Sequence, residues 1–414
     1  MKRETNIPFC LLSVLGIIFV VDGHLNHSFF DIGGLIPYYA FHMPLFVFIS
    51  GYFFRMDEGE SLWGFAERKF VRLMIPYYFW NLVYGLLAAF LRRNGFLFGE
   101  PVTFNTMFLE PFRLGYQFIL NHAAWFVPSL FLVELVYRAL SSWKFCKNKG
   151  KSVWSLFWLT FAGGICGIIM SRAAGNEGFF LTAEKMLFLL PFYSAGVLYR
   201  RELEAKDRLG NGLYFSVILG AAVVLWLSGK PLIYSVSTCR DFSGCLLPYI
   251  TGFLGIAFWL RVSKILAPAF RSSRFLEFFG RNTFSIMMHH MMVFFLLTTC
   301  FAFGAKYMGM FGDFDFARYK SDIYYCYRPG GEAQWIIIYL LAGLMVPLGF
   351  QKILMIFRGK VKITYFNQIR QWIHEKKTGI IRQEPYNVSD SGESGRDKAL
   401  NMKTDQQKEK SEVK

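Results

Sequence analysis

Apolar segments of transmembrane length recur along most of this chain, and they constrain the fold more than any other feature. A helix needs about 20 consecutive apolar residues to cross the hydrocarbon core of a bilayer. Hydrophobic residues make up 54% of the 414 residues and charged residues 18%, whereas a soluble domain has about 25% charged residues. The sequence therefore predicts an all-α polytopic membrane protein. It excludes a secreted disulfide scaffold, a nucleic-acid-binding domain and a disordered chain.

Ten segments have the length and apolarity of membrane spans, which predicts about ten transmembrane helices in one bundle. They fall at 7–27, 33–54, 73–91, 123–140, 153–171, 180–199, 212–229, 244–260, 282–303 and 333–351. The sixth segment is the weakest, because it contains Glu184 and Lys185.

The net charge of +16 follows the loops between these segments. Of the 45 lysines and arginines, 34 belong to the N-terminus, to every second loop after it and to the C-terminal region. Lysine and arginine concentrate in the cytoplasmic loops of membrane proteins. The pattern predicts that both termini are cytoplasmic and that the basic residues face a lipid bilayer rather than nucleic acid.

Composition divides the chain into three parts. Residues 1–355 hold the predicted spans and form the membrane domain. Residues 356–383 are basic and interleaved with apolar side chains, as expected of a cytoplasmic segment on anionic headgroups. Residues 384–414 have almost no apolar side chains and are expected to be disordered.

The seven cysteines show no spacing typical of a metal site, so no metal is expected. Cys239, Cys245 and Cys326 lie in loops predicted at the outer face. A disulfide between two of them and three free thiols are both compatible with the sequence.

Ionisable side chains within spans are costly, face the bundle interior and often mark function. Here they are Asp22, His24, His42, Glu134, His289 and His290. A helical rise places His24 roughly 25 Å from the cytoplasmic start of its span, near the outer end. The same rise places His42 about 14 Å below the outer end of the second span.

Asp22 and His24 are two residues apart, so on a helix their side chains point in nearly opposite directions. We therefore expect any carboxylate partner of His24 to come from another helix, with Glu134 as the candidate. His289 and His290 also diverge, so at most one of them should face a shared site. For each of these histidines, a hydrogen-bonded packing role remains the alternative.

Three cations stand at the predicted cytoplasmic entrance of the third span. Lys69 lies three residues before Arg72, and Arg68 lies four residues before it. On a helix, each of the two therefore shares a face with Arg72. Such a group can bind a phosphorylated ligand, because guanidinium groups donate forked hydrogen bonds to phosphate. Ordinary anchoring at the membrane surface is the alternative.

Several of these residues lie in motifs with a recognisable pattern. The motifs are Val-Val-Asp-Gly-His-Leu at 20–25, Phe-His-Met-Pro-Leu-Phe at 41–46 with Ser-Gly-Tyr-Phe-Phe at 50–54, Lys-x-x-Arg-Leu at 69–73 with Pro76-Tyr77, Trp-Phe-Val-Pro-Ser-Leu at 125–130, and Phe-Gly-Arg-Asn-Thr-Phe-Ser-Ile at 279–286 before His289-His290. In blocks covering about 7–355, the chain resembles the membrane acyltransferase 3 family. Within it, the chain looks closest to the sugar O-acetyltransferase branch typified by fucose 4-O-acetylase.

The resemblance implies an integral membrane O-acyltransferase of the bacterial plasma membrane. It would transfer an acyl group, usually acetyl, from cytoplasmic acyl-CoA to a hydroxyl of a cell-surface or lipid-linked carbohydrate. The family's catalytic histidine falls on His24, and its donor-binding motif falls on Lys69 and Arg72. One departure is clear: the basic residue that the family carries eleven positions before the histidine is Ser13 here.

A mechanism can be written for these residues. A neutral imidazole accepts a proton near pH 7, so we expect His24 to deprotonate the acceptor hydroxyl. His42, Ser50 and Asn26 are candidates for hydrogen bonds to the oxyanion or the substrate.

Two alternatives remain open. One is a transporter, flippase or polymerase of lipid-linked sugars, although the chain shows no repeated halves. The other is a family member without activity, which the serine at position 13 would suit.

Overall fold

The computed structural model describes residues 5–25, 30–56, 59–142, 151–173 and 176–360. These residues form helices and connecting loops, and their only β-type pairing is an isolated bridge between Ser235 and Arg240. The α-helices are α1 (Ile7–Gly23), α2 (His42–Tyr52), α3 (Leu62–Lys69), α4 (Ile75–Arg93), α5 (Phe126–Ser141), α6 (Lys151–Ala173), α7 (Gly178–Leu198), α8 (Asn211–Leu227), α9 (Leu247–Leu266), α10 (Arg274–Arg281), α11 (Thr283–Tyr307), α12 (Phe316–Ser321) and α13 (Gln334–Lys360). The predicted all-α class is confirmed.

Seven helices of the described part are long and apolar enough to cross a membrane, which supports the multi-pass prediction. They are Leu62–Arg93, His122–Ser141, Val153–Ala173, Gly178–Lys206, Leu247–Phe270, Thr283–Tyr307 and Gln334–Phe357. The helices Ile7–Gly23 and Asn211–Leu227 are apolar but shorter. The count of ten spans and the cytoplasmic termini stay predictions.

The second predicted span is not a continuous helix. Residues 33–54 were expected to be helical, but α2 covers only His42–Tyr52. Gly33 and Gly34 have positive φ angles, and Pro37 follows them. This backbone cannot continue a right-handed helix. His42 therefore lies at the first turn of α2 instead of deep within a span, which corrects its predicted depth.

Local sequence explains how α1 begins. The side chain of Asn6 accepts a hydrogen bond from the backbone N–H of Phe9 at 3.2 Å, and Pro8 occupies the first turn. A side-chain cap and a proline at this position are typical of helix N-termini. The helix ends at Gly23, so His24 is its C-cap residue.

Two glycines allow α2 and α7 to cross closely. A Cβ atom on Gly51 would lie 2.0 Å from the carbonyl oxygen of Tyr193, and one on Gly196 would lie 2.1 Å from that of Phe48. Small residues at a crossing let the backbones of membrane helices approach each other. This explains why glycine stands within the Ser-Gly-Tyr-Phe-Phe motif.

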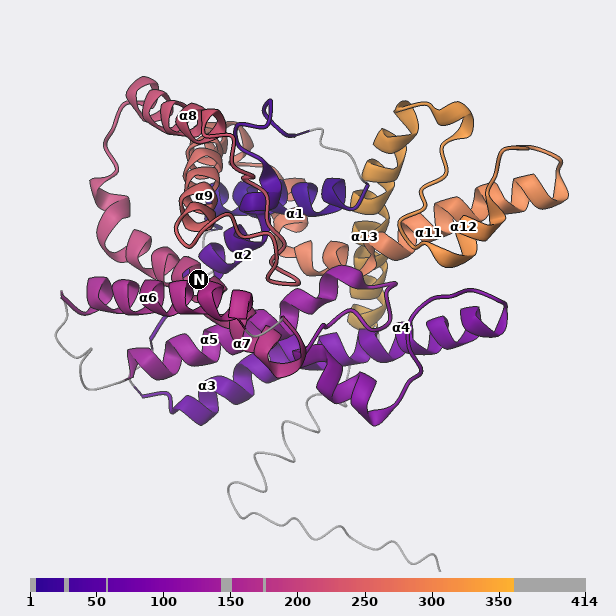
Figure 1. Cartoon of the computed structure of the whole chain (residues 1–414), viewed down its shortest axis with the longest axis horizontal. Helices are drawn as coiled ribbons and strands as arrows, with labels where there is room; N and C mark the ends of the chain where they lie inside the picture. The colour runs from indigo at the N-terminus through magenta and orange to yellow at the C-terminus, as the bar shows by residue number, and fades with distance from the viewer. Residues whose placement is uncertain (1–4, 26–29, 57–58, 143–150, 174–175, 361–414) are drawn as a thin grey trace, which may run out of the picture. The chain divides into compact units, whose positions relative to one another are not determined.

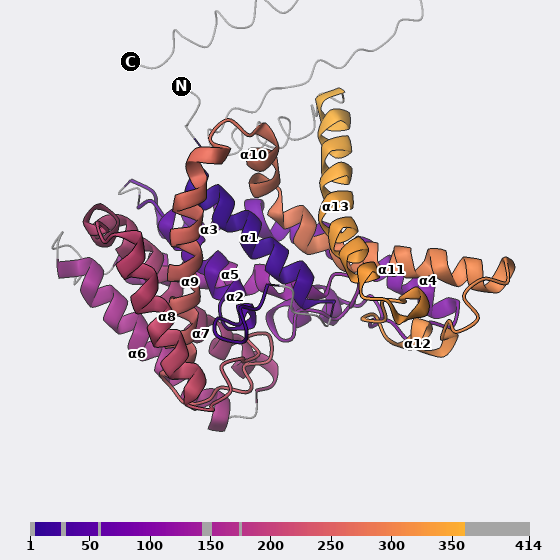
Figure 2. The same cartoon turned by 90° about the horizontal axis from the view of Figure 1, so that it is seen from above.

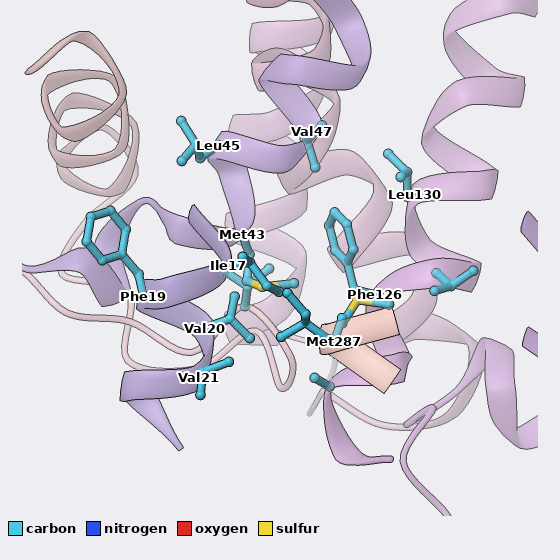
Figure 3. Close-up of a cluster of buried hydrophobic side chains, with 14 of the residues drawn as sticks. Ile17, Phe19, Val20, Val21, Met43, Leu45, Val47, Phe126, Leu130 and Met287 are labelled. Atoms are coloured by element: carbon cyan, nitrogen blue, oxygen red, sulfur yellow. The ribbon is translucent and has the colours of Figure 1, made fainter. Parts of the chain in front are cut away.

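Helices α1 and α2 lie at the centre of the helical unit. Both views place α1 between α9 on one side and α11 on the other (Figures 1 and 2). Helix α2 packs on α1, α5, α7 and α9. Buried side chains from α1, α2, α5 and α11 form one apolar cluster, in which Figure 3 labels Val20, Met43, Leu130, Phe126 and Met287.

Some predictions concern residues outside the described part. The basic segment at 356–383 lies beyond it except for the end of α13, and the tail at 384–414 lies beyond it entirely. The division of the chain at residue 355 thus stays a prediction. The three loop cysteines are described, and Cys239, Cys245 and Cys326 are free thiols. The disulfide alternative is wrong for this structure.

Candidate functional site

A cavity of about 670 Å³ lies where the C-terminal end of α1, the start of α2 and the turn before α5 meet. Histidine, tyrosine, serine and aspartate side chains form its polar lining, and the indole ring of Trp125 also lines it. These polar lining residues are His24, Tyr39, His42, His122, Tyr234, Ser235, Ser237, Asp241, Asp322 and Tyr324. A cavity of this size and lining suits a small polar ligand with several hydroxyl groups.

His24 is half-buried on the cavity wall. Its ring centroid lies 5.1 Å from that of His290, 5.7 Å from that of His122 and 6.0 Å from that of Tyr324. The rings come from four separate segments of the chain. The structure thus gathers around His24 three side chains whose contact with it was not predicted from the sequence.

The end of α1 is tied to the turn before α2. The hydroxyl of Tyr39 donates a hydrogen bond to the carbonyl oxygen of Gly23, the residue before His24. The rings of Tyr39 and His42 meet edge to face at 5.3 Å. These contacts hold the two predicted site histidines, His24 and His42, on one cavity wall.

The tautomer of His42 follows from its partner. Its Nδ1 lies 2.8 Å from the carbonyl oxygen of Tyr38. A carbonyl oxygen only accepts hydrogen bonds, so Nδ1 carries the hydrogen and Nε2 of the neutral ring is an acceptor. Neutral His42 can therefore accept a hydrogen bond from a substrate hydroxyl, but its Nε2 cannot donate to an oxyanion.

Adjacent histidines of α11 have different surroundings. His290 is fully buried beside His24, and its Nδ1 lies 2.8 Å from the carbonyl oxygen of Ile286. His289 faces α4, where its Nδ1 lies 2.6 Å from the hydroxyl of Tyr84 and its ring lies 4.4 Å from that of Trp80. Of the two, only His290 lies beside His24, which agrees with the expectation that at most one of them faces a shared site.

The loop between α8 and α9 supplies a wall that the sequence analysis did not identify. Ser235 and Arg240 exchange two backbone hydrogen bonds of 3.1 and 3.2 Å, which closes a tight turn. Tyr234 is buried and donates to the carbonyl oxygens of Ala40 and Pro248, which anchors the turn. Ser235 and Ser237 are half-buried on the cavity wall. A hydroxyl-rich stretch in an otherwise apolar chain was the available signal.

Tyr324 lines the cavity from the loop between α12 and α13. Its ring stacks on that of His24 at 6.0 Å and meets that of His122 edge to face at 5.6 Å. Burial raises the pKa of the Tyr324 phenol, so it stays protonated and able to donate a hydrogen bond. Asp322 is held beside it, because its carboxylate accepts hydrogen bonds from the backbone of Tyr324 and from Arg318.

Glu134 is not near His24, which corrects the predicted carboxylate–histidine pair. Its carboxylate accepts a hydrogen bond of 2.7 Å from Lys69, and both side chains are largely buried. Twelve residues separate His122 from Glu134, which corresponds to about 18 Å along a helix. The physical reason is charge: a buried ammonium group needs a buried carboxylate more than a neutral imidazole does.

The three predicted donor-binding cations differ in their surroundings. Arg68 makes a two-pronged ion pair with Glu60, with distances of 2.8 and 2.7 Å. Lys69 is committed to Glu134, whereas Arg72 is exposed and forms no ion pair with a described residue. Arg72 stands in a π-helical turn, Phe70–Met74. Such turns are frequent at functional sites.

The other predicted site residues lie apart from the cavity. Ser50 lies eight residues beyond His42 on α2, about 12 Å along the helix, and does not line the cavity. Asn26 lies outside the described residues. Ser13, which replaces the family's basic residue, donates its hydroxyl hydrogen to the carbonyl oxygen of Phe9 at 2.9 Å. No group of three His, Cys, Asp or Glu side chains in the described ranges is arranged to hold a metal ion.

The fold and the cavity define a helical membrane protein with a histidine-lined pocket. Residues 11–354 match the acyltransferase domain family, Acyl_transf_3. The chain belongs to this family, and the predicted family resemblance is confirmed. No curated protein and no solved structure matches the chain.

Proposed function

We propose that this membrane acyltransferase transfers an acyl group, most simply acetyl, from acyl-CoA to a hydroxyl of a carbohydrate. The observation that carries the proposal is the half-buried His24 on the wall of a polar cavity of about 670 Å³. Hydroxyl, imidazole and aromatic side chains together suit a sugar, which needs both hydrogen bonds and flat apolar surfaces. The acceptor is taken to be a cell-surface or lipid-linked glycan of the bacterial plasma membrane.

His24 is the base of this proposal. It removes the proton of the acceptor hydroxyl as that oxygen attacks the thioester carbon. The bond from oxygen to carbon forms, the bond from carbon to sulfur breaks, and His24 returns its proton to the departing thiolate. His42, Tyr39 and Tyr324 hold the acceptor, with neutral His42 accepting a hydroxyl hydrogen and Tyr324 donating one.

The phosphates of the donor are assigned to the cations around the π-helical turn. Arg72 is exposed and has no carboxylate partner among the described residues, so it is the first candidate. Arg68 can join it by exchanging Glu60 for phosphate, because that pair is on the surface and weak. Lys69 is the poorest candidate, since removing it from Glu134 would leave a buried carboxylate unpaired.

Helix α5 connects the cavity with the cations assigned to the donor phosphates. Phe126, Leu130 and Glu134 follow one another at intervals of four residues and therefore share one helix face. Trp125, at the start of this helix, lines the cavity, and Glu134 reaches the cations. An acyl-CoA whose phosphates sit at Arg72 would extend its flexible arm along this face. With the donor cytoplasmic, the cavity then faces outward.

Deleting the gene and replacing His24 by alanine test the proposal in cells. Mass spectrometry of surface glycans should show acetyl esters in wild-type cells and a loss of about 10²- to 10⁴-fold in the transfer rate for His24→Ala. His289→Ala is the matched control, because His289 bonds to Tyr84 and does not line the cavity. Normal acetylation with normal amounts of the His24→Ala protein would contradict the proposal. A glycan that reaches the surface only when the gene is present, and carries no ester, would instead favour a transporter.

A further inference from the structure

We propose that His290 is a positioning residue for His24. Its Nε2 accepts a hydrogen bond from the ring N–H of His24 and leaves the opposite nitrogen of His24 to take the acceptor proton. The effect of His290 on acyl transfer rests on the function proposed above. The contact between the two rings does not, and it can be tested separately.

The tautomer of His290 is fixed by the backbone. Its Nδ1 lies 2.8 Å from the carbonyl oxygen of Ile286, one turn earlier on α11. Because the carbonyl oxygen has no hydrogen to donate, Nδ1 carries the hydrogen of the neutral ring. Its Nε2 is therefore a lone-pair acceptor. Helix α11 is 25 residues long, so this nitrogen is held on a rigid element.

The acceptor nitrogen is buried and unused. Nε2 of His290 has no hydrogen-bond partner among the residues that the structure describes, and the side chain is 0% exposed. Buried polar atoms are rarely left without a partner, and an exception calls for an explanation, of which a catalytic role is one. The nearest ring is that of His24, whose centroid lies 5.1 Å away at an interplanar angle of 35°.

This separation allows the proposed contact after a small movement. A nitrogen at the edge of each ring can approach the other to hydrogen-bond distance while the centroids stay near 5 Å apart, a value close to that observed. Hydrogen bonds between catalytic groups are often loose without substrate and shorten when the substrate binds.

The neighbouring rings do not offer the same contact. His122 meets His24 edge to face at 77°, and its Nδ1 is also buried without a described partner, so its tautomer is not fixed. The Tyr324 ring lies nearly parallel to that of His24, at 18°. Of these three neighbours, His290 alone combines full burial, a fixed tautomer and an acceptor nitrogen.

In the transfer step His290 stays neutral. The proton of the acceptor hydroxyl moves to the far nitrogen of His24, and the N–H on the near side stays bonded to Nε2 of His290. The positive ring of His24 is then stabilised by that lone pair until it gives the proton to the thiolate. His290 thus orients the base and stabilises its protonated form, as an orienting group does for other catalytic histidines.

Labelling of His24 with diethyl pyrocarbonate tests the contact without any sugar acceptor. This reagent acylates an unprotonated imidazole nitrogen, and the rate at the His24 peptide can be followed by mass spectrometry of the purified protein in nanodiscs. A group that orients a metal-ligating histidine through a hydrogen bond is worth roughly 10- to 100-fold in affinity or activity, and we take the same range here. We expect His290→Leu to lower acyl transfer by that factor and to slow labelling of His24 by about threefold, a fraction of that effect.

Two further variants separate orientation from packing. His290→Gln keeps an amide oxygen that can accept from His24 and should restore most of the labelling rate. His289→Leu, one residue away but facing Tyr84, should change neither quantity. If His290→Leu does not fold, His290→Met takes its place, because its volume is closer to that of histidine.

Unchanged labelling of His24 in the apolar variant, or a glutamine variant as impaired as the apolar one, would overturn the inference. Slower labelling in a protein that transfers no acyl group would leave the contact in place and overturn the proposed function instead.

Discussion

The histidine cavity at the start of α5 and the ion pairs near its other end differ in how their polar groups are satisfied. At the cavity, the histidine rings meet backbone carbonyl groups and one another, and no carboxylate binds His24 among the described residues. At the other end, Lys69 and Arg68 are neutralised by Glu134 and Glu60. The first arrangement leaves ring nitrogens ready to accept protons. The second satisfies charge within the fold, so variants at the two ends should report different properties.

Between these ends lies an apolar layer. Val20 and Met43 line the cavity and continue into the buried cluster with Phe126, Leu130 and Met287 (Figure 3). Two of these side chains are methionines, which are flexible and tolerate rearrangement. A long thin substrate arm can displace such side chains more readily than branched ones.

The largest effect is expected at the buried ion pair. Glu134→Ala should lower the free energy of unfolding by about 3–5 kcal/mol, because it leaves the ammonium group of Lys69 buried without a counter-charge. Thermal unfolding of the detergent-solubilised protein measures this. The double variant Lys69→Met with Glu134→Leu should recover most of the lost stability. A stable single variant would show that Lys69 can reach solvent and that the two ends are more alike than proposed.

Arg72 provides the opposite case. It is exposed and has no ion pair within the described part of the chain, so Arg72→Ala should leave the unfolding temperature unchanged. Loss of a charged hydrogen-bond donor to phosphate should weaken acyl-CoA binding by about 1.5–3 kcal/mol, measured by calorimetry. Arg93→Ala, another exposed arginine at the far end of α4, is the control. Equal binding by both variants would remove the phosphate role of Arg72.

Tyr39 sharpens the comparison at the cavity. Tyr39→Phe removes the hydrogen bond to the carbonyl oxygen of Gly23 and keeps the ring. We expect a loss of about 0.5–1.5 kcal/mol in transition-state stabilisation, because His24 is less firmly held. Rates of acetyl transfer measure it, with Tyr307→Phe at an exposed ring as control. A change in acyl-CoA binding without a change in rate would place Tyr39 in the donor path.

The smallest effect is expected at Glu60. Its surface pair with Arg68 competes with phosphate for the same guanidinium group. Glu60→Gln should therefore tighten acyl-CoA binding by about 0.2–1 kcal/mol, the range for exposed ion pairs. The unfolding temperature should stay nearly constant. Weaker binding would mean that Glu60 orients Arg68 for the donor and does not compete with it.

Parts of the site were predictable from sequence for definite reasons. His24 and His42 were identified because an ionisable side chain in an apolar segment is unusual wherever it faces, and both line the cavity. His290 was noticed for the same reason, but its contact with His24 was not predicted. Counting residues along separate helices cannot give the height at which two helices meet.

The partner of Glu134 shows the same limit. Sequence spacing excluded Asp22 as a partner that faces His24, but it could not choose between His24 and Lys69 for Glu134, because both lie on other helices. The wall formed by Ser235 and Ser237 was not predicted. Residues in a loop far along the chain reach the cavity through tertiary contacts such as the hydrogen bonds of Tyr234 to Ala40 and Pro248.

The sequence alone determined that this chain is an all-helical membrane protein of the acyltransferase family with a histidine near the end of its first helix. Apolar length and short motifs are local properties, so they can be read residue by residue. Only the tertiary structure decided which histidines meet, which cation pairs with each carboxylate, and which nitrogen of His290 has no hydrogen-bond partner among the described residues. Those outcomes depend on the crossing of helices distant in sequence, where packing and charge neutralisation select one partner among several.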